Sequence, residues 1–325
     1  MLSRWLSGAP TRLAASLSLA GFLGRTRGWD RLTFCNEEWV MHLGRDTVAV
    51  ITGAGNGIGL AIATELVARG ARVAIADIDA GRAREAAASL DDAARGYGCD
   101  VTDAAALEAL AGAVIRDFGG VDIVFANAGV CIGGALLDAD PREDEWLYDV
   151  NVHGAIRTVR AFMPALRARA EAKGAARIVL TGSENSVGLP TLGPSSIYTS
   201  TKHAILGIAD ALRRDLEGTG VGVSLFCPGL TATRIWNGRA ARQERYGGPK
   251  VVSDDAAAQM TQMLSAAGQD PALTARICLD GVEQNEFLIF TDPSIRTLTV
   301  RRHAEVDAAL DRLDERISAY APQKA

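Results

Sequence analysis

The sequence has few of the residues that build disulfide-rich, metal-bound or aromatic-lined proteins. Its 325 residues include five cysteines and four histidines, and aromatic residues make up only 6%. The cysteines are scattered, form no CxxC pair and have no histidine cluster beside them, so the usual zinc-site patterns are missing and we expect no metal. An odd number of dispersed thiols is typical of a reduced, intracellular protein.

Long basic stretches and long apolar runs are also missing. The formal net charge is −5, which argues against nucleic acid as a partner. The apolar stretch at 13–24 is too short to span a bilayer comfortably, and no other segment could cross one, so we expect no membrane partner. A hydrophobic content of 48% suits a globular core of Ala, Val, Ile and Leu, as in buried parallel sheets.

The first forty residues allow three interpretations. Residues 1–29 carry four arginines and several serines, with no acidic residue before Asp30. This composition suits a mitochondrial transit peptide, a secretory signal, or an extension that is not native. Because Met41 opens a natural domain start, we expect an extension over 1–40 and a single domain over 41–325. The domain is expected in the cytoplasm, or in the mitochondrial matrix if 1–40 is a transit peptide.

From residue 47 onward, short apolar runs alternate with helical patterns. This alternation predicts an α/β fold, a doubly wound seven-stranded parallel sheet of the Rossmann type. A long helix is expected at 142–170 with a bend at Pro164, a polar lid at 231–285 and a charged C-terminal helix at 293–325. The predicted strands are 47–52, 72–77, 96–101, 121–129, 176–183, 221–229 and 286–290.

A glycine-rich turn follows the first predicted strand. The segment TGAGNGIG (52–59) has Gly53, Gly57 and Gly59 at the spacing of a turn that opens a helix, with Asn56 and Ile58 between them. Without side chains at these points the backbone amides can approach a pyrophosphate. A tight turn without ligand and a methyltransferase-type adenosine loop are the alternatives.

Two acidic residues at later strand ends extend this site. Asp77 ends the second strand, where a carboxylate can accept both ribose hydroxyls and would repel a 2′-phosphate. No Arg or Lys lies in the loop or directly after Asp77, so we expect NAD to be preferred over NADP. Asp100 ends the third strand and is placed to bind the adenine amino group. Either acid could instead cap a helix, and Asp79 is the competing cap beside Asp77.

The stretch SSIYTSTKHAI (195–205) places a tyrosine and a lysine on one helical face. Tyr198 and Lys202 are four residues apart, so their side chains are neighbours. A tyrosine is a poor base near neutral pH, and a nearby positive charge lowers its pKa toward a useful range. The pair therefore predicts a catalytic site for proton transfer, with a solvated helix pair as the alternative.

These motifs, in this order, resemble the short-chain dehydrogenase/reductase family over about 45–292. The resemblance implies an NAD(P)-dependent oxidoreductase acting on CH–OH groups, with Lys202 also holding the nicotinamide ribose. It implies that Ser183 orients the substrate oxygen and that Asn151 holds a water that relays protons to Lys202. The resemblance further assigns Val101, the NAG segment (Asn127, Ala128 and Gly129), Pro228, Gly229, Thr231 and Thr233 to the cofactor site.

Two departures from the family pattern stand out. The family usually has Val where Thr231 stands. The distance from Ser183 to Tyr198 is about two residues longer than is common, so Ser186 is an alternative to Ser183 and Asn185 occupies the usual spacing.

The substrate is predicted from the residues around these motifs. Most candidates for the pocket are apolar, which favours a secondary alcohol or ketone with a bulky hydrophobic or aromatic body. The pocket candidates are Glu184, Val187, Leu189, Ile197, Leu230 and Trp236.

The alternatives to this function are a catalytically inactive dinucleotide-binding regulator, an epimerase and a dehydratase. The family resemblance also implies association through helices, so we expect a homodimer or homotetramer.

Overall fold

The computed structural model describes residues 41–190 and 195–320, and the predicted N-terminal extension lies outside them. The strands are β1 (Val48–Thr52), β2 (Arg72–Asp77), β3 (Ala94–Gly98), β4 (Ile123–Ala126), β5 (Ala176–Thr181), β6 (Val221–Cys227) and β7 (Leu288–Phe290). The α-helices are α1 (Gly57–Ala68), α2 (Ala80–Ala88), α3 (Ala104–Phe118), α4 (Pro141–Tyr148), α5 (Gly154–Lys173), α6 (Ser196–Asp215), α7 (Asp254–Ala267), α8 (Pro271–Glu283) and α9 (Ile295–Tyr320).

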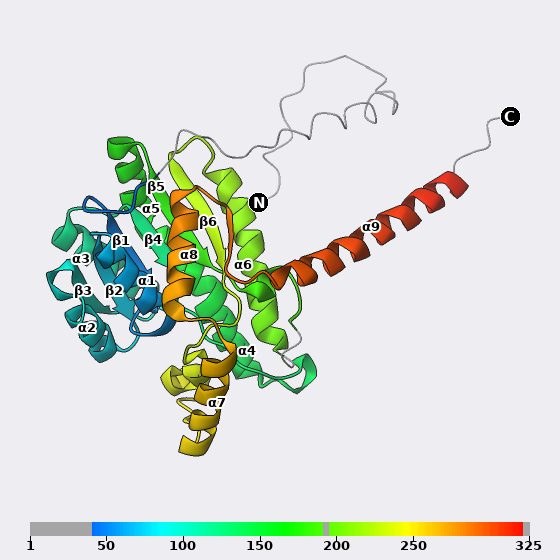
Figure 1. Cartoon of the computed structure of the whole chain (residues 1–325), viewed down its shortest axis with the longest axis horizontal. Helices are drawn as coiled ribbons and strands as arrows, with labels where there is room; N and C mark the ends of the chain where they lie inside the picture. Colours follow the sequence, from blue (N-terminus) through cyan, green and yellow to red (C-terminus); the bar gives the residue numbers. More distant parts are fainter. Residues whose placement is uncertain (1–40, 191–194, 321–325) are drawn as a thin grey trace, which may run out of the picture. The chain divides into compact units, whose positions relative to one another are not determined.

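The seven strands form one parallel sheet in the order β3-β2-β1-β4-β5-β6-β7 (Figure 1). The chain moves outward from β1 to β3 and then returns to the other side of β1 to continue from β4. The carboxyl ends of β1 and β4 therefore meet where the strand order reverses, which is where ligands bind in such sheets. The predicted doubly wound fold is confirmed.

Successive residues of the central strands face opposite helical layers. Val48 and Val50 of β1 belong to one buried cluster with residues of α3, α5 and α6. Ala49 and Ile51 belong to a second cluster with residues of α1, α2 and α8. Both sheet faces are thus covered, which explains why the strands are continuous apolar runs without alternation.

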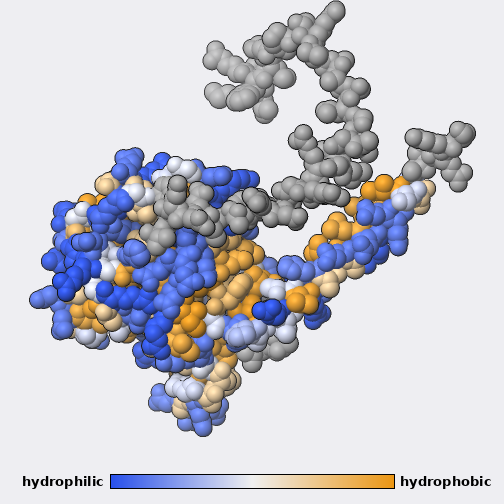
Figure 2. Space-filling view, turned by 45° about the horizontal axis from the view of Figure 1, so that its top comes forward, coloured by the Kyte–Doolittle hydropathy of each residue, from blue (hydrophilic) through white to orange (hydrophobic). Residues whose placement is uncertain are grey.

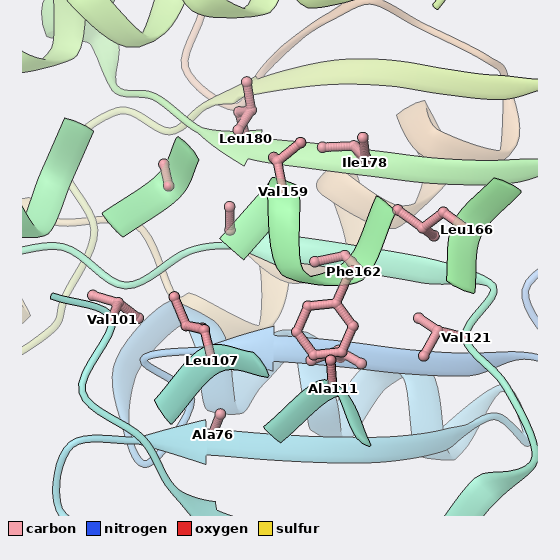
Figure 3. Close-up of a cluster of buried hydrophobic side chains, with 14 of the residues drawn as sticks. Ala76, Val101, Leu107, Ala111, Val121, Val159, Phe162, Leu166, Ile178 and Leu180 are labelled. Carbon is pink, nitrogen blue, oxygen red and sulfur yellow. The ribbon is translucent and has the colours of Figure 1, made fainter. Parts of the chain in front are cut away.

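The α3–α5 side of the core is tightly filled. In Figure 3, Phe162 of α5 projects toward Ala111 of α3, and Ile178 and Leu180 project from β5. Phe162 is fully buried. Burying such a side chain stabilises the fold by about 1.5–3 kcal/mol relative to leaving it exposed.

Most predicted elements differ from the structure by a few residues at their ends, and two differ more. The third strand is Ala94–Gly98, earlier than 96–101. This strand packs closely against α2. A Cβ on Gly96 would stand only 2.3 Å from the carbonyl oxygen of Ala83, so a residue without a side chain is needed there. The predicted helix 142–170 is two helices, α4 and α5, separated by a π-helical turn at Asp149–His153, and α5 continues through Pro164.

The region after β6 contains two kinds of structure. Residues 235–250, called here the post-β6 segment, form two 3-10 turns at Ile235–Ala241 and Glu244–Tyr246. Helix α7 follows with one buried residue, Leu264. Helix α8 instead packs into the core beside α1. The predicted lid region 231–285 therefore includes a helix of the main layer.

Helix α9 is present where a C-terminal helix was predicted. Its first turn is anchored by buried Ile295, and Leu298 lies against Gly188. From Val300 onward its side chains are exposed, and Figure 2 shows apolar residues along it. Among the described residues, no helix is long and apolar enough to cross a membrane.

Candidate active site

A single cavity of about 830 Å³ lies over the carboxyl ends of the strands. It brings together most of the residues predicted for the cofactor and for catalysis. Asn151 and Ser186 are not among its lining residues, and neither are the pocket candidates Val187, Leu189 and Ile197. The predicted residues that line it are Gly53, Asn56, Gly57, Ile58, Gly59, Asp77, Asp100, Val101, Asn127, Ala128, Gly129, Ser183, Glu184, Tyr198, Lys202, Pro228, Gly229, Leu230, Thr231, Thr233 and Trp236.

The glycine turn has the form of an anion cradle. Gly53 and Gly57 have φ of +65° and +59°, which disfavours other residues. A Cβ on Gly57 would meet only Thr233, at 3.5 Å, so it would project into the space at the start of α1. The N-cap residue Asn56 makes no side-chain capping bond. The first amides of α1 are therefore free to bind phosphates, and the turn fits a dinucleotide.

Asp77 is held at the edge of the cavity by backbone amides. Its Oδ2 accepts from Gly55 N at 2.9 Å and its Oδ1 from Asp79 N at 3.0 Å. Helix α2 is capped by Asp79, which accepts from Arg82 N. Asp77 is therefore free of the capping role that was its alternative interpretation.

Arg82 also lines the cavity, although no sequence motif predicted it there. Its guanidinium pairs with Asp79 Oδ2 at 3.1 Å on the first turn of α2. The sequence has no Arg or Lys in the loop or directly after Asp77, whereas α2 brings Arg82 back to the same wall.

Asp100 is bonded from two sides. Its Oδ1 accepts from the Thr102 backbone amide at 2.9 Å and the Thr102 hydroxyl at 2.6 Å. Its Oδ2 accepts from Gln243 Nε2, in the post-β6 segment, at 2.7 Å. Asp103 caps α3, so Asp100 does not have the capping role that was its alternative.

The NAG segment ties three strands together beneath the cavity. Asn127 Nδ2 donates to Thr52 O at 2.9 Å, and its Oδ1 accepts from the Thr181 hydroxyl at 3.2 Å. The Thr52 hydroxyl oxygen accepts from the backbone amides of Asn127 and Ala128. These bonds fix the cavity floor without using a ligand.

Tyr198 and Lys202 occupy the first turns of α6, which begins at Ser196. Both are buried, and Lys202 Nζ lies 5.6 Å from the centre of the Tyr198 ring. Lys202 Nζ donates to Thr181 O at 2.8 Å. The pair is therefore part of the cavity wall and not a solvated helix pair.

Ser183 is held by its neighbours on the turn after β5. Its hydroxyl donates to Asn185 Oδ1 at 3.1 Å and accepts from Asn185 N at 3.3 Å. Asn185 Nδ2 in turn donates to the Thr199 hydroxyl at 2.7 Å. Ser186 is fully buried, and its hydroxyl accepts from Ser183 N. Of the two candidate serines, Ser183 is the one that lines the cavity.

Asn151 lies in the π-helical turn, behind the cavity wall. Its Oδ1 accepts from Val130 N at 2.8 Å, and its Nδ2 donates to Val130 O and to the Thr201 hydroxyl. Both amide hydrogens are therefore engaged by the protein. Asn151 and Lys202 both lie next to Gly129, so the residues predicted to act together are close.

Burial dominates the electrostatics of the catalytic pair. It raises the pKa of Tyr198 well above its ordinary value, although a hydrogen bond with Ser183 acts the other way. Burial also lowers the pKa of Lys202 to about 8. In the protein without cofactor, desolvation is therefore the largest influence on the tyrosine pKa, and the lowering expected from Lys202 together with an oxidised nicotinamide stays a prediction.

The post-β6 segment is attached to α4 and to the π-helical turn that follows it. Buried Glu143 of α4 accepts from Arg239 at 2.8 and 2.7 Å and from fully buried Arg242 at 2.9 Å. The Tyr246 hydroxyl donates to Asp149 at 2.5 Å. No sequence motif predicted these contacts, because they join residues about a hundred positions apart.

Comparison with known proteins identifies the family. A family model described as short chain dehydrogenase matches residues 47–244. The chain belongs to the short-chain dehydrogenase/reductase family. It is therefore an oxidoreductase acting on CH–OH groups with a nicotinamide dinucleotide, and the resemblance seen in the sequence is confirmed.

Three relatives show the extent of this similarity. The chain is 34% identical over 233 residues to 1-deoxy-11-beta-hydroxypentalenate dehydrogenase of Streptomyces exfoliatus, covering 70% of this chain and 82% of that one. It is 32% identical over 203 residues to galactitol 2-dehydrogenase of Agrobacterium fabrum, covering 62% and 77%. A crystal structure of a family member from Burkholderia phymatum in complex with NAD has a TM-score of 0.75 and 31% identity, covering 83% of this chain and 97% of that one.

Proposed function

We propose that this dehydrogenase interconverts a secondary alcohol and a ketone, prefers NAD and takes a bulky hydrophobic or aromatic substrate. The observation that carries the proposal is one shared cavity. Ser183, Tyr198 and Lys202 line the same space as the glycine turn and Asp77. A bound nicotinamide would supply the hydride chemistry, and the protein's own residues would handle the proton.

The proton step is assigned to Tyr198. Its ionised phenolate oxygen takes the alcohol proton in oxidation, and the resulting hydroxyl group gives a proton to the ketone oxygen in reduction. Because burial raises the pKa of Tyr198, ionisation needs positive charge nearby, and Lys202 is the cation that shares its helical face. Proton transfer at a tuned pKa accelerates a reaction about 10²–10⁴-fold.

Ser183 and Asn151 have supporting roles in the proposal. Ser183 orients the substrate oxygen, and for this its hydroxyl hydrogen must turn from Asn185 toward the cavity. Asn151 holds the proton-relay water beside Lys202. Since both of its amide hydrogens are used by Val130 and Thr201, that water would be bound through an oxygen atom of Asn151.

The preference for NAD rests on Asp77. Its carboxylate is fixed by two backbone amides and faces the cavity beyond the glycine turn. Such a carboxylate can accept from the ribose hydroxyls and repels a phosphate in the same place. Arg82 pairs with Asp79, which leaves Asp77 as the residue that selects the ribose.

The substrate class rests on the lining of the cavity outside the cofactor motifs. Several apolar side chains line it there, which suits an apolar body on the alcohol. Glu184 is the acidic exception, and burial together with nearby Asp292 raises its pKa. The apolar residues there include Ile132, Leu230, Ile235, Trp236, Val252, Met260, Met263 and Leu264.

The decisive experiment compares Tyr198→Phe with the wild type on a panel of aliphatic and aryl secondary alcohols with NAD. We expect NADH formation with the bulky members and a loss of about 10³-fold in the variant, with NADH binding retained. Tyr97→Phe is the matched control, because Tyr97 bonds Asp117 and is not a lining residue. Turnover retained in Tyr198→Phe contradicts the mechanism. A regulator would bind NADH without turnover, and product analysis would reveal an epimerase or dehydratase.

A further inference from the structure

Gln243 presents an unusual pair of contacts at the adenosine end of the cavity. Its Nε2 donates to Asp100 Oδ2 at 2.7 Å, across 143 residues of sequence. Its Oε1 is buried and has no hydrogen-bond partner among the described residues. A buried amide oxygen without a donor is uncommon in a folded protein and calls for an explanation.

The position of Gln243 is fixed on both sides. Arg242 is fully buried, pairs with Glu143 and donates from Nε to Gly248 O at 2.8 Å. On the other side, Arg245 donates to the Thr102 hydroxyl at 2.6 Å. The Gln243 side chain therefore reaches Asp100 from an anchored stretch of backbone.

Asp100 and Gln243 together form a pair of acceptors. Asp100 Oδ1 is used by Thr102, whereas Oδ2 accepts one bond and keeps a second lone pair. The unpartnered Gln243 Oε1 is the other acceptor. Both residues line the cavity that contains Asp77. The complementary ligand group is a primary amino group on a planar ring, which has two N–H donors.

We propose that Gln243 is an adenine-binding residue, and that its Oε1 accepts one hydrogen of the exocyclic amino group while Asp100 Oδ2 accepts the other. This inference rests on the proposed placement of the dinucleotide. A base with an oxo group at this position would set lone pairs against lone pairs, so the site selects adenine. Because Gln243 belongs to the post-β6 segment, adenine then joins this segment to the end of β3.

The test measures binding, not turnover. Fluorescence titration gives the dissociation constants of two ligands, NADH and reduced nicotinamide hypoxanthine dinucleotide. The proteins compared are the wild type, Gln243→Met and Gln262→Leu. Hypoxanthine carries oxygen in place of the amino group. Gln262 is the control because it is exposed on α7 and is not a lining residue.

We expect the wild type and Gln262→Leu to bind NADH more tightly than the hypoxanthine analogue. In Gln243→Met the NADH constant should rise about three- to tenfold, the value of one neutral hydrogen bond, while that of the analogue stays nearly unchanged. An equal rise for both ligands means that Gln243 only packs the segment, and overturns the proposal. Absence of NADH binding in the wild type would instead contradict the proposed function.

Discussion

The floor of the cavity and the post-β6 segment that reaches over to Asp100 differ in how their buried polar groups are bonded. We use the floor to mean the part of the cavity formed by the NAG segment, the turn after β5 and the start of α6. The floor side chains that bond to other parts of the protein are Asn127, Ser183, Asn185 and Lys202. In the described residues, four buried side-chain atoms have no partner, and three of them lie at 236–243: Trp236 Nε1, Asn237 Oδ1 and Gln243 Oε1.

This difference separates two tasks. A floor whose hydrogen bonds are complete holds its catalytic groups in place before any ligand arrives, which is what fast chemistry requires. A segment with unpartnered groups can gain partners from a ligand, as we propose for Gln243 and adenine. Substitutions in the floor should therefore lower kcat. Substitutions of Asp77 at the cavity edge, or in the post-β6 segment, should instead weaken cofactor binding.

The largest expected effect is at Lys202. We expect Lys202→Met to lower kcat about 10³-fold, because the buried tyrosinate loses the cation on its helical face. NADH binding should weaken far less, since the glycine turn and Asp77 are intact. Initial rates and fluorescence titration measure the two quantities. If Lys202→Met instead loses NADH binding and keeps kcat, Lys202 serves cofactor binding and not the chemical step, which contradicts the role given to the floor.

The same variant should be more stable than the wild type at neutral pH. Lys202 has a pKa of about 8 when folded and an ordinary value of 10.5. As pH falls from 10.5 to 8 the unfolded chain gains a proton that the folded chain does not, so stability falls and the penalty is complete below pH 8. That penalty is about 3 kcal/mol. Loss of the bond to Thr181 O offsets about 1 kcal/mol.

Thermal unfolding of the wild type and Lys202→Met at pH 7 and above pH 10.5 tests this sign. We expect the variant to be about 2 kcal/mol more stable at pH 7, and the gain to disappear at the higher pH. A gain that is the same at both pH values would show that packing, and not the buried charge, is responsible.

Asp77 should show the next largest effect, and it should appear in binding. Asp77→Ala removes the carboxylate that we propose accepts from the ribose hydroxyls, and we expect a loss of about 2 kcal/mol or a roughly 30-fold rise in the Kd of NAD. Binding of NADP should improve, because Arg82 lies on the same wall. Titration of Asp77→Ala and of Asp77→Ala with Arg82→Ala separates the two causes. Unchanged selectivity in Asp77→Ala would contradict the assignment.

The sequence predicted the floor better than the segment. The glycine turn, Asp77, Ser183 and the Tyr198–Lys202 pair were predictable because each depends on local spacing at a strand end or along one helix. The long helix was not, because its break at 149–153 places Asn151 against Val130, a contact between separate elements.

The contacts of the post-β6 segment were harder still to predict. Gln243 and Arg242 lie in a polar run that carries no recognisable motif, and only folding brings them to Asp100 and Glu143. Asn185 was noted for its spacing, but its bonds to Ser183 and Thr199 depend on how the turn after β5 meets α6.

A smaller binding effect is expected from the anchor of the segment. Glu143→Gln keeps the shape of the side chain but removes the charge that pairs with Arg239 and buried Arg242. The segment should open more readily, raising KM for NAD about tenfold, because a buried charge without its partner costs several kcal/mol. We expect kcat to stay within about twofold. The control is Glu145→Gln, exposed on the same helix. A fall in kcat at constant KM would place Glu143 with the floor.

The smallest expected effect tests how exactly placed the floor must be. Thr199 is not a lining residue of the cavity, yet its hydroxyl accepts from Asn185 Nδ2 and so fixes the amide that holds the Ser183 hydroxyl. Thr199→Val keeps the volume and removes that acceptor. We expect kcat to fall about fivefold, the value of one neutral hydrogen bond, with KM for NAD unchanged. Thr199→Ser restores the hydroxyl without the methyl group and should recover most of the rate. If the valine variant keeps the wild-type kcat, or if Thr199→Ser fails to restore it, the Asn185 amide does not position Ser183. The complete hydrogen bonding of the floor would then stabilise the fold without affecting the rate.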